Sequence, residues 1–261
     1  MTLGVTTTWL ARGGAVAAAV AALELLWVHR ALADTGVFGW PVLRRDLVMA
    51  PRWLRAVADC VFSYRGIMAV LVIQLASALA LPWLSHPALP WLVVASTLLI
   101  SIRFRGTYNG GSDAMLLIVM VALGLARGAP GSRAAEAGLA YAAVQLVLSY
   151  FVAGIAKLPD PAWRSGRAVT DLVRLPHYRA PAWAIAALSR ASVARTAAWS
   201  MLAFECSFPL AFVHPSVCTG LMICGVGFHL VTAIVLGLNR FLWTWLTAYP
   251  ALLYWVDRVN A

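Results

Sequence analysis

The feature that most constrains this chain is the recurrence of long apolar runs without the alternation of a β-strand. Apolar residues make up 62% of its 261 residues and charged residues only 11%, against about 45–50% and about 25% in soluble domains. In a bilayer, backbone groups must pair within their own segment, so such runs favour membrane helices. The sequence therefore predicts an all-α polytopic membrane protein.

The apolar runs predict a helical bundle of about eight transmembrane spans within one membrane domain, residues 1–261. We expect this domain to lie in a bacterial cytoplasmic membrane. The connections 214–216 and 239–240 are tight, so the last three spans should be consecutive neighbours. The predicted spans are residues 13–28, 66–84, 89–102, 114–126, 137–156, 196–213, 217–238 and 241–256.

Basic residues divide unevenly between the two predicted membrane faces. Sixteen of the 20 lie in loops on one side and four on the other. Because cytoplasmic loops carry the excess of Lys and Arg, this split places both termini outside the cytoplasm. Residues 29–65 and 158–195 form two long loops that combine arginine with tryptophan, which predicts interfacial helices along the headgroup layer. The net charge of +10 thus indicates the lipid bilayer as partner, not nucleic acid.

The sequence lacks the motifs of several common metal sites and enzyme classes. The four cysteines show no CxxC spacing and read as small buried residues, so we expect no metal site. The sequence also contains no HExxH, no GxSxG and no glycine-rich phosphate loop ending in Gly-Lys.

Lys157 is the only lysine, and the other 19 basic residues are arginine. Lysine can lose its proton when desolvated, whereas arginine cannot. Tyr150, Ala153, Gly154 and Lys157 share one face at helical spacing, and the small residues leave room for a flat ligand or a neighbouring helix. The alternative is a snorkelling lysine that ends a span.

Glu205 and His229 are ionisable residues within predicted spans, which makes each a site candidate. Their distances from the connecting turn differ by about 6 Å along a helix axis. A glutamate and an imidazole could nearly close that gap, directly or through water. Such a contact would be either a structural hydrogen bond or a proton-handling pair, since histidine titrates nearest neutrality.

The polar segment 103–113 could form a wall beside Lys157, with Asn109 lining the cofactor. Gly110 and Gly111 allow a close approach of the backbone. Alternatively, Ser112 or Asp113 simply caps the next helix.

The motif YFVAGIAKL at 150–158, followed by Trp163 and Gly166, closely resembles vitamin K-dependent gamma-glutamyl carboxylase and its bacterial relatives, the HTTM (horizontally transferred transmembrane) families. The likeness covers nearly the whole chain, and its core motif is specific. Weaker similarities lie at residues 36–41, 108–113, 228–229 and at Asn239, Phe241, Tyr249 and Pro250.

The resemblance implies an enzyme. In the carboxylase, the lysine of this motif is the base that deprotonates reduced vitamin K, oxygen then attacks, and carbon dioxide finally adds to a glutamate. Carried over, Lys157 is the base on a reduced quinone-type cofactor, with molecular oxygen as co-substrate. The expected cofactor-binding residues are Tyr150, Gly154, Asn109 and Trp163.

His229 and Glu205 would join Lys157 as catalytic residues by supplying a proton relay. The sequence departs from the family where Gly110 and Gly111 replace a histidine segment. It also ends soon after the last predicted span, so we expect no counterpart of the carboxylase's extramembrane region.

Two other functions remain open from the sequence. HTTM-type chains include some that resemble the sporulation-delaying protein B family, which implies a non-enzymatic membrane factor for maturation or export of a small secreted peptide. A proton-coupled carrier would instead use Glu205 and His229. A quinone or another lipid-like small molecule is the expected ligand of the enzyme.

Overall fold

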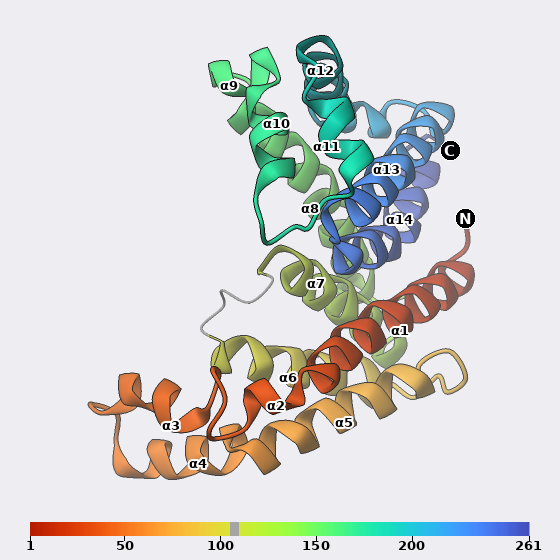
Figure 1. Cartoon of the computed structure of the whole chain (residues 1–261). Helices are drawn as coiled ribbons and strands as arrows, with labels where there is room; N and C mark the ends of the chain where they lie inside the picture. The colour runs from red at the N-terminus through yellow and green to blue at the C-terminus, as the bar shows by residue number, and fades with distance from the viewer. Residues whose placement is uncertain (105–109, 261) are drawn as a thin grey trace. The chain divides into compact units, whose positions relative to one another are not determined.

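The computed structural model describes residues 1–104 and 110–260. Every regular element assigned in these two ranges is helical (Figure 1). The α-helices are α1 (Leu3–Trp27), α2 (His29–Leu32), α3 (Trp40–Leu43), α4 (Arg52–Phe62), α5 (Tyr64–Ala80), α6 (Ala88–Arg103), α7 (Gly110–Gly128), α8 (Arg133–Lys157), α9 (Pro161–Ser165), α10 (Arg167–Arg174), α11 (Ala182–Leu188), α12 (Ala191–Ser207), α13 (Pro215–Leu236) and α14 (Asn239–Val259). Two 3₁₀-helices, η1 (Arg44–Leu47) and η2 (Phe208–Phe212), complete the set.

Among the residues that the structure describes, four helices are long and apolar enough to cross a membrane, namely α1, α7, α8 and α13. A fifth candidate is the pair α4 and α5, which is bent by 62° at Ser63. These helices are consistent with an integral membrane protein. Each of the eight predicted spans coincides with a helix, but the count of eight is not established.

The other three predicted spans correspond to α6, α12 and α14, which are too short or too polar to count as membrane-crossing helices. The 16 residues of α6 and the 17 of α12 span about 24–26 Å at 1.5 Å per residue, less than a hydrocarbon core of about 30 Å. The 21 residues of α14 are long enough, but the helix carries Arg240, Asp257 and Arg258 and is more polar.

The contacts of the chain divide it into two compact units. Unit 1 contains residues 1–6 and 139–261, and unit 2 contains residues 7–138. The division falls within α1 and α8. The expectation of a single membrane domain stays a prediction.

In unit 2, α6 packs against both α5 and α7. A buried cluster, which includes Leu25, Ile67, Leu71 and Ile100, ties the end of α1 to α5 and α6. The first long loop folds into α2, α3, η1 and α4, as the sequence predicts for short helices there. Trp40 anchors this loop by donating from its indole Nε1 to Asp59 Oδ1 at 2.8 Å.

Two arginines of unit 2 donate to backbone carbonyls at helix ends or in the turns that follow them, where carbonyls have no partner within a helix. Arg103 is 1% exposed and donates to the carbonyls of Leu32, Phe38 and Phe62 at 2.9–3.2 Å. Arg127 donates to the carbonyls of Leu81 and Leu84, just beyond α5, at 2.9 and 3.0 Å. These contacts are structural and were not foreseen from the charge pattern.

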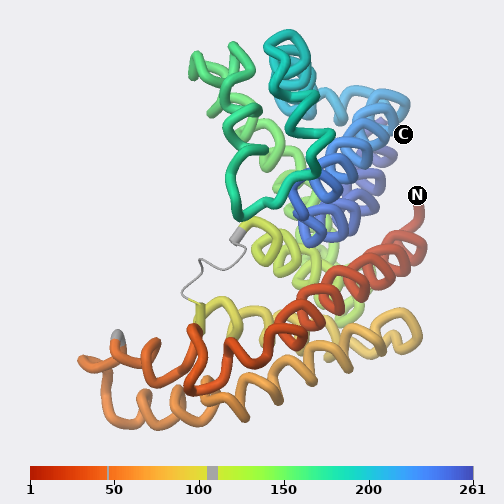
Figure 2. Tube along the Cα trace, in the orientation of Figure 1, coloured from red at the N-terminus to blue at the C-terminus, as the bar shows by residue number. Residues whose placement is uncertain are grey.

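In unit 1, α13 packs against α14, η2 and α12, so the last three predicted spans are neighbours as expected (Figures 1 and 2). The second long loop folds into α9, α10 and α11, which contact α12 or one another. Gly166 lies between α9 and α10 with φ of 83°. A Cβ atom there would lie 2.5 Å from the backbone nitrogen of Arg195, so both the turn and the close approach to α12 require glycine.

Residues 1–6 belong to the same unit. The amino group of Met1 forms an ion pair with Asp257 near the end of α14.

Candidate functional site

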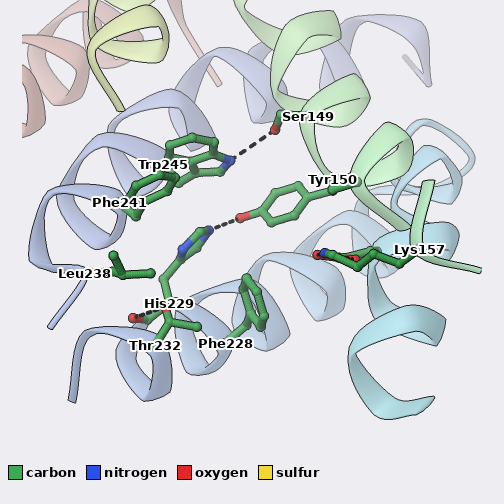
Figure 3. A pocket seen from close by; sticks show the side chains of 11 residues that line it. Ser149, Tyr150, Lys157, Phe228, His229, Thr232, Leu238, Phe241 and Trp245 are labelled. Atoms are coloured by element: carbon green, nitrogen blue, oxygen red, sulfur yellow. Dashed lines mark hydrogen bonds and ion pairs between the residues drawn. The ribbon is translucent and has the colours of Figure 1, made fainter. Parts of the chain in front are cut away.

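The end of α8 positions the residues that the sequence singled out. Tyr150, Ala153 and Lys157 line one pocket of about 230 Å³, the polar pocket. Their shared orientation follows from helical spacing, as predicted. Residues of α12, α13 and α14 complete the lining, among them Glu205, Phe228, His229, Phe241 and Trp245 (Figure 3).

Lys157 forms an ion pair with Glu205. Its Nζ lies 2.6 Å from Oε1 and 2.7 Å from Oε2 of the carboxylate. The Glu205 side chain is 4% exposed and that of Lys157 22%. The ammonium also lies 5.3 Å from the ring centroid of Trp163 on α9, within the range of a cation–π contact.

Gly154 brings α8 and α12 together, which makes this ion pair possible. A Cβ atom at Gly154 would lie 2.8 Å from both Glu205 Cβ and Cys206 Sγ. The residue therefore faces α12 rather than the polar pocket. The structure gives Gly154 a packing role, and its predicted contact with a cofactor stays a prediction.

Glu205 and His229 do not bond to each other directly, although both line the polar pocket. Glu205 bonds to Lys157, whereas His229 Nε2 lies 2.7 Å from the hydroxyl of Tyr150. The span prediction placed Glu205 in the middle of a helix, but α12 ends at Ser207 and η2 follows. Glu205 is thus in the last turn of α12, where it meets the end of α8.

A second, separate set of polar contacts links two lining residues, Tyr150 and His229, to Tyr249 behind the pocket wall. The Tyr150 hydroxyl lies between His229 Nε2 and the hydroxyl of Tyr249, 3.0 Å away on α14. Figure 3 shows the Tyr150 ring reaching from α8 toward His229, with the indole of Trp245 donating to Ser149 at 3.0 Å.

An apolar pocket of about 200 Å³ lies next to the polar one. The two share Phe228 and Thr232 as lining residues. Otherwise the apolar pocket is formed mainly by aliphatic side chains of α10, α12 and α13, together with Trp163. Trp163 therefore contacts the Lys157 ammonium and also lines this apolar space, while its predicted contact with a cofactor stays a prediction.

Trp245 is a pocket residue that the sequence reasoning missed. Phe241, which also lines the pocket, and Tyr249, which contacts Tyr150, were noted in the sequence only for their likeness to the family. The three residues follow one another at intervals of four on α14 and so share a face. That spacing is visible in the sequence and could have identified them. The predicted cofactor residue Asn109 lies outside the residues that the structure describes.

Within residues 1–104 and 110–260, no group of three or more His, Cys, Asp or Glu side chains could hold a metal ion. Comparisons of the chain with protein-family models, with curated proteins and with solved structures found no match.

Proposed function

We propose that this chain is an integral membrane enzyme that uses Lys157 as a base on a reduced quinone-type cofactor, in line with its resemblance to the gamma-glutamyl carboxylase core. The observation that carries the proposal is the Lys157–Glu205 ion pair at the wall of an aromatic-lined pocket. An ion pair that only stabilised the fold would not need to line a cavity, as Lys157 does.

The residues present fit a flat aromatic head group with oxygen substituents. Tyr150, Phe228, Phe241 and Trp245 offer ring faces and edges, which favour stacked or edge-to-face contacts with another ring. Ser149, His229 and Thr232 supply polar groups in the same lining. A pocket of about 230 Å³ is below the usual range for whole ligands, and the adjacent apolar pocket would take a hydrocarbon tail.

The carboxylate of Glu205 can accept a proton from the Lys157 ammonium. Transfer from the ammonium to the carboxylate produces a neutral amine and a neutral carboxylic acid, without any net change in charge. Lysine, unlike arginine, can release a proton in this way. The free amine can then accept a proton from a ligand hydroxyl.

A bound reduced quinone would supply an aromatic hydroxyl whose anion reacts with molecular oxygen. Lys157 takes the hydroxyl proton, while Trp163 and Glu205 hold the ammonium that results. Oxygenation of the quinone, coupled to carboxylation or another modification of a small or peptide substrate, is the proposed outcome.

For the membrane arrangement, we propose eight spans with both termini outside the cytoplasm of a bacterial cell. The support is that each predicted span coincides with a helix and that basic residues are concentrated in two loops. The short helices α4 and α10 would lie in the headgroup layer, since α4 exposes Trp53 and Val57 beside Arg52 and Arg55.

The experiment is purification of the full chain in mild detergent, followed by mass spectrometry of extracted lipids and titration with menadiol, the reduced form of menadione. A co-purifying quinone, or menadiol binding that Glu205→Gln weakens, supports the proposal. If menadiol does not bind and the lipid extract contains no quinone, the proposed function is rejected. A bound secreted peptide would instead favour the maturation or export function.

A further inference from the structure

A buried chain of three polar groups, Tyr249, Tyr150 and His229, crosses the interior of unit 1. The three residues are 4%, 3% and 3% exposed. The Tyr150 hydroxyl occupies the middle position, 3.0 Å from the Tyr249 hydroxyl and 2.7 Å from His229 Nε2. A hydroxyl has one hydrogen and can donate to only one of two partners. The chain therefore runs in one of two directions.

In the first direction, Tyr249 donates to Tyr150, and Tyr150 donates to His229 Nε2. Both hydroxyl hydrogens then have acceptors. In the reverse direction, His229 donates to Tyr150 and Tyr150 donates to Tyr249, whose own hydrogen has no other hydrogen-bond partner among the described residues. A buried donor left without an acceptor disfavours that arrangement by roughly 5- to 150-fold in population.

The favoured direction determines where the proton of the neutral imidazole lies. Because Nε2 accepts from Tyr150, the ring proton must be on Nδ1. No hydrogen-bond partner for Nδ1 lies within residues 1–104 or 110–260, and His229 lines the polar pocket. A side chain that is 3% exposed thus keeps one polar atom available to a ligand.

We propose that Tyr150, buried between Tyr249 and His229, holds His229 as the Nδ1–H tautomer, so that the polar pocket presents a hydrogen-bond donor to an acceptor oxygen of its ligand. This inference rests on the proposed function for the existence of a ligand, and it specifies that ligand's chemistry as a carbonyl or phenolate oxygen. His229 is then a binding residue, not the proton acceptor that the sequence suggested. Lys157 removes a proton, and the imidazole N–H stabilises negative charge on oxygen.

The tautomer can be tested without any ligand. Full-length protein in detergent, with histidine labelled by nitrogen-15, is examined by NMR, and His229→Asn assigns the His229 signals among those of the five histidines. We expect a neutral ring with its proton on Nδ1. Tyr249→Phe should keep this tautomer, since Tyr150 then has only Nε2 as acceptor, while Tyr150→Phe should give a mixture. An Nε2–H or doubly protonated ring in the wild type, or an unchanged tautomer in Tyr150→Phe, overturns the proposal.

The donor role is tested with menadione, whose ring carries two carbonyl acceptors, and with methylnaphthalene as an oxygen-free control. Menadione should shift the Nδ1 signal and bind about fivefold or more tightly than methylnaphthalene, the contribution expected of one hydrogen bond. Menadione that binds without moving this signal overturns the donor role and leaves the proposed function standing. Absence of menadione binding contradicts both the donor role and the proposed quinone site, while the tautomer is decided by the first experiment.

Discussion

Nζ of Lys157 lies within 2.7 Å of both carboxylate oxygens of Glu205, a residue 48 positions away on another helix. The one lysine of the chain is thus paired with a glutamate that is 4% exposed. Because a buried charge without its partner is costly, the two residues should be coupled in stability as well as in chemistry.

Glu205→Gln should lower the free energy of unfolding by about 1–3 kcal/mol, since it leaves the ammonium of Lys157 without a counter-charge. Lys157→Met should have a similar effect. In the double mutant the loss should be smaller than the sum of the singles by about 0.5–3 kcal/mol. Denaturation in detergent measures all three, with the exposed Asp171→Asn as a charge-loss control. Strictly additive losses would mean that the ion pair does not form in solution.

Gly154→Ala should separate α8 from α12. Its Cβ would lie 2.8 Å from Glu205 Cβ and Cys206 Sγ, and overpacking of this kind costs about 1–3 kcal/mol. The matched control is Gly227→Ala on α13, where a Cβ atom meets nothing within 4 Å. That change should be neutral or stabilising by up to about 1 kcal/mol because alanine favours a helix. Equal melting temperatures for the two variants would contradict the close packing at Gly154.

Arg103→Lys tests whether the buried guanidinium holds the first loop of unit 2. A lysine cannot bridge the carbonyls of Leu32, Phe38 and Phe62, which Arg103 contacts together. We expect a loss of about 2 kcal/mol or more in stability, together with faster proteolysis within residues 29–65. The exposed Arg52→Lys should change stability by less than about 0.5 kcal/mol. Similar behaviour of the two variants would exclude a structural role for Arg103.

Tyr150→Phe and Tyr249→Phe each remove the hydrogen bond between the two hydroxyls. Because that bond is lost in either single variant, the double variant should lose about 0.5–1.5 kcal/mol less than the sum of the singles. Tyr141 is 55% exposed, so Tyr141→Phe is the control for loss of a tyrosine hydroxyl. A double-mutant cycle with no coupling energy would show that the hydroxyls do not bond in the folded protein.

The local features of the site could be predicted from the sequence, whereas its partnerships could not. Of the four residues that helical spacing grouped on one face, Tyr150, Ala153 and Lys157 line the polar pocket, whereas Gly154 packs against α12. The absence of other lysines drew attention to Lys157. Its partner was missed because α12 ends at Ser207 and continues as η2, in which Pro209 is the second residue. That break shifts Glu205 relative to His229, and no periodicity in the sequence reports it.

The roles of Arg103 and Arg127 also depend on tertiary structure. Arg103 was counted only as a basic loop residue, yet it is almost fully buried and its partners are backbone carbonyls far away in the chain. Backbone acceptors carry no signature in the sequence, because every residue has one. Charge counting can therefore suggest the topology of such a chain but not identify which of its charges are structural.

The last prediction concerns chemistry at Lys157. Lys157→Arg keeps the positive charge and can keep the ion pair with Glu205, so the variant should fold and melt much like the wild type. A guanidinium, however, cannot give up its proton to Glu205 at any accessible pH. If Lys157 is the base, menadiol-dependent oxygen uptake, corrected for autoxidation, should fall about 10²- to 10⁴-fold. Menadiol binding should change far less than this rate, because the ring-lined walls of the polar pocket remain. Arg164→Lys, an exchange of cations at an exposed neighbouring position, serves as the control and should retain activity. Full oxygen uptake by a well-folded Lys157→Arg variant would reduce Lys157 to a structural partner of Glu205 and exclude it as the base.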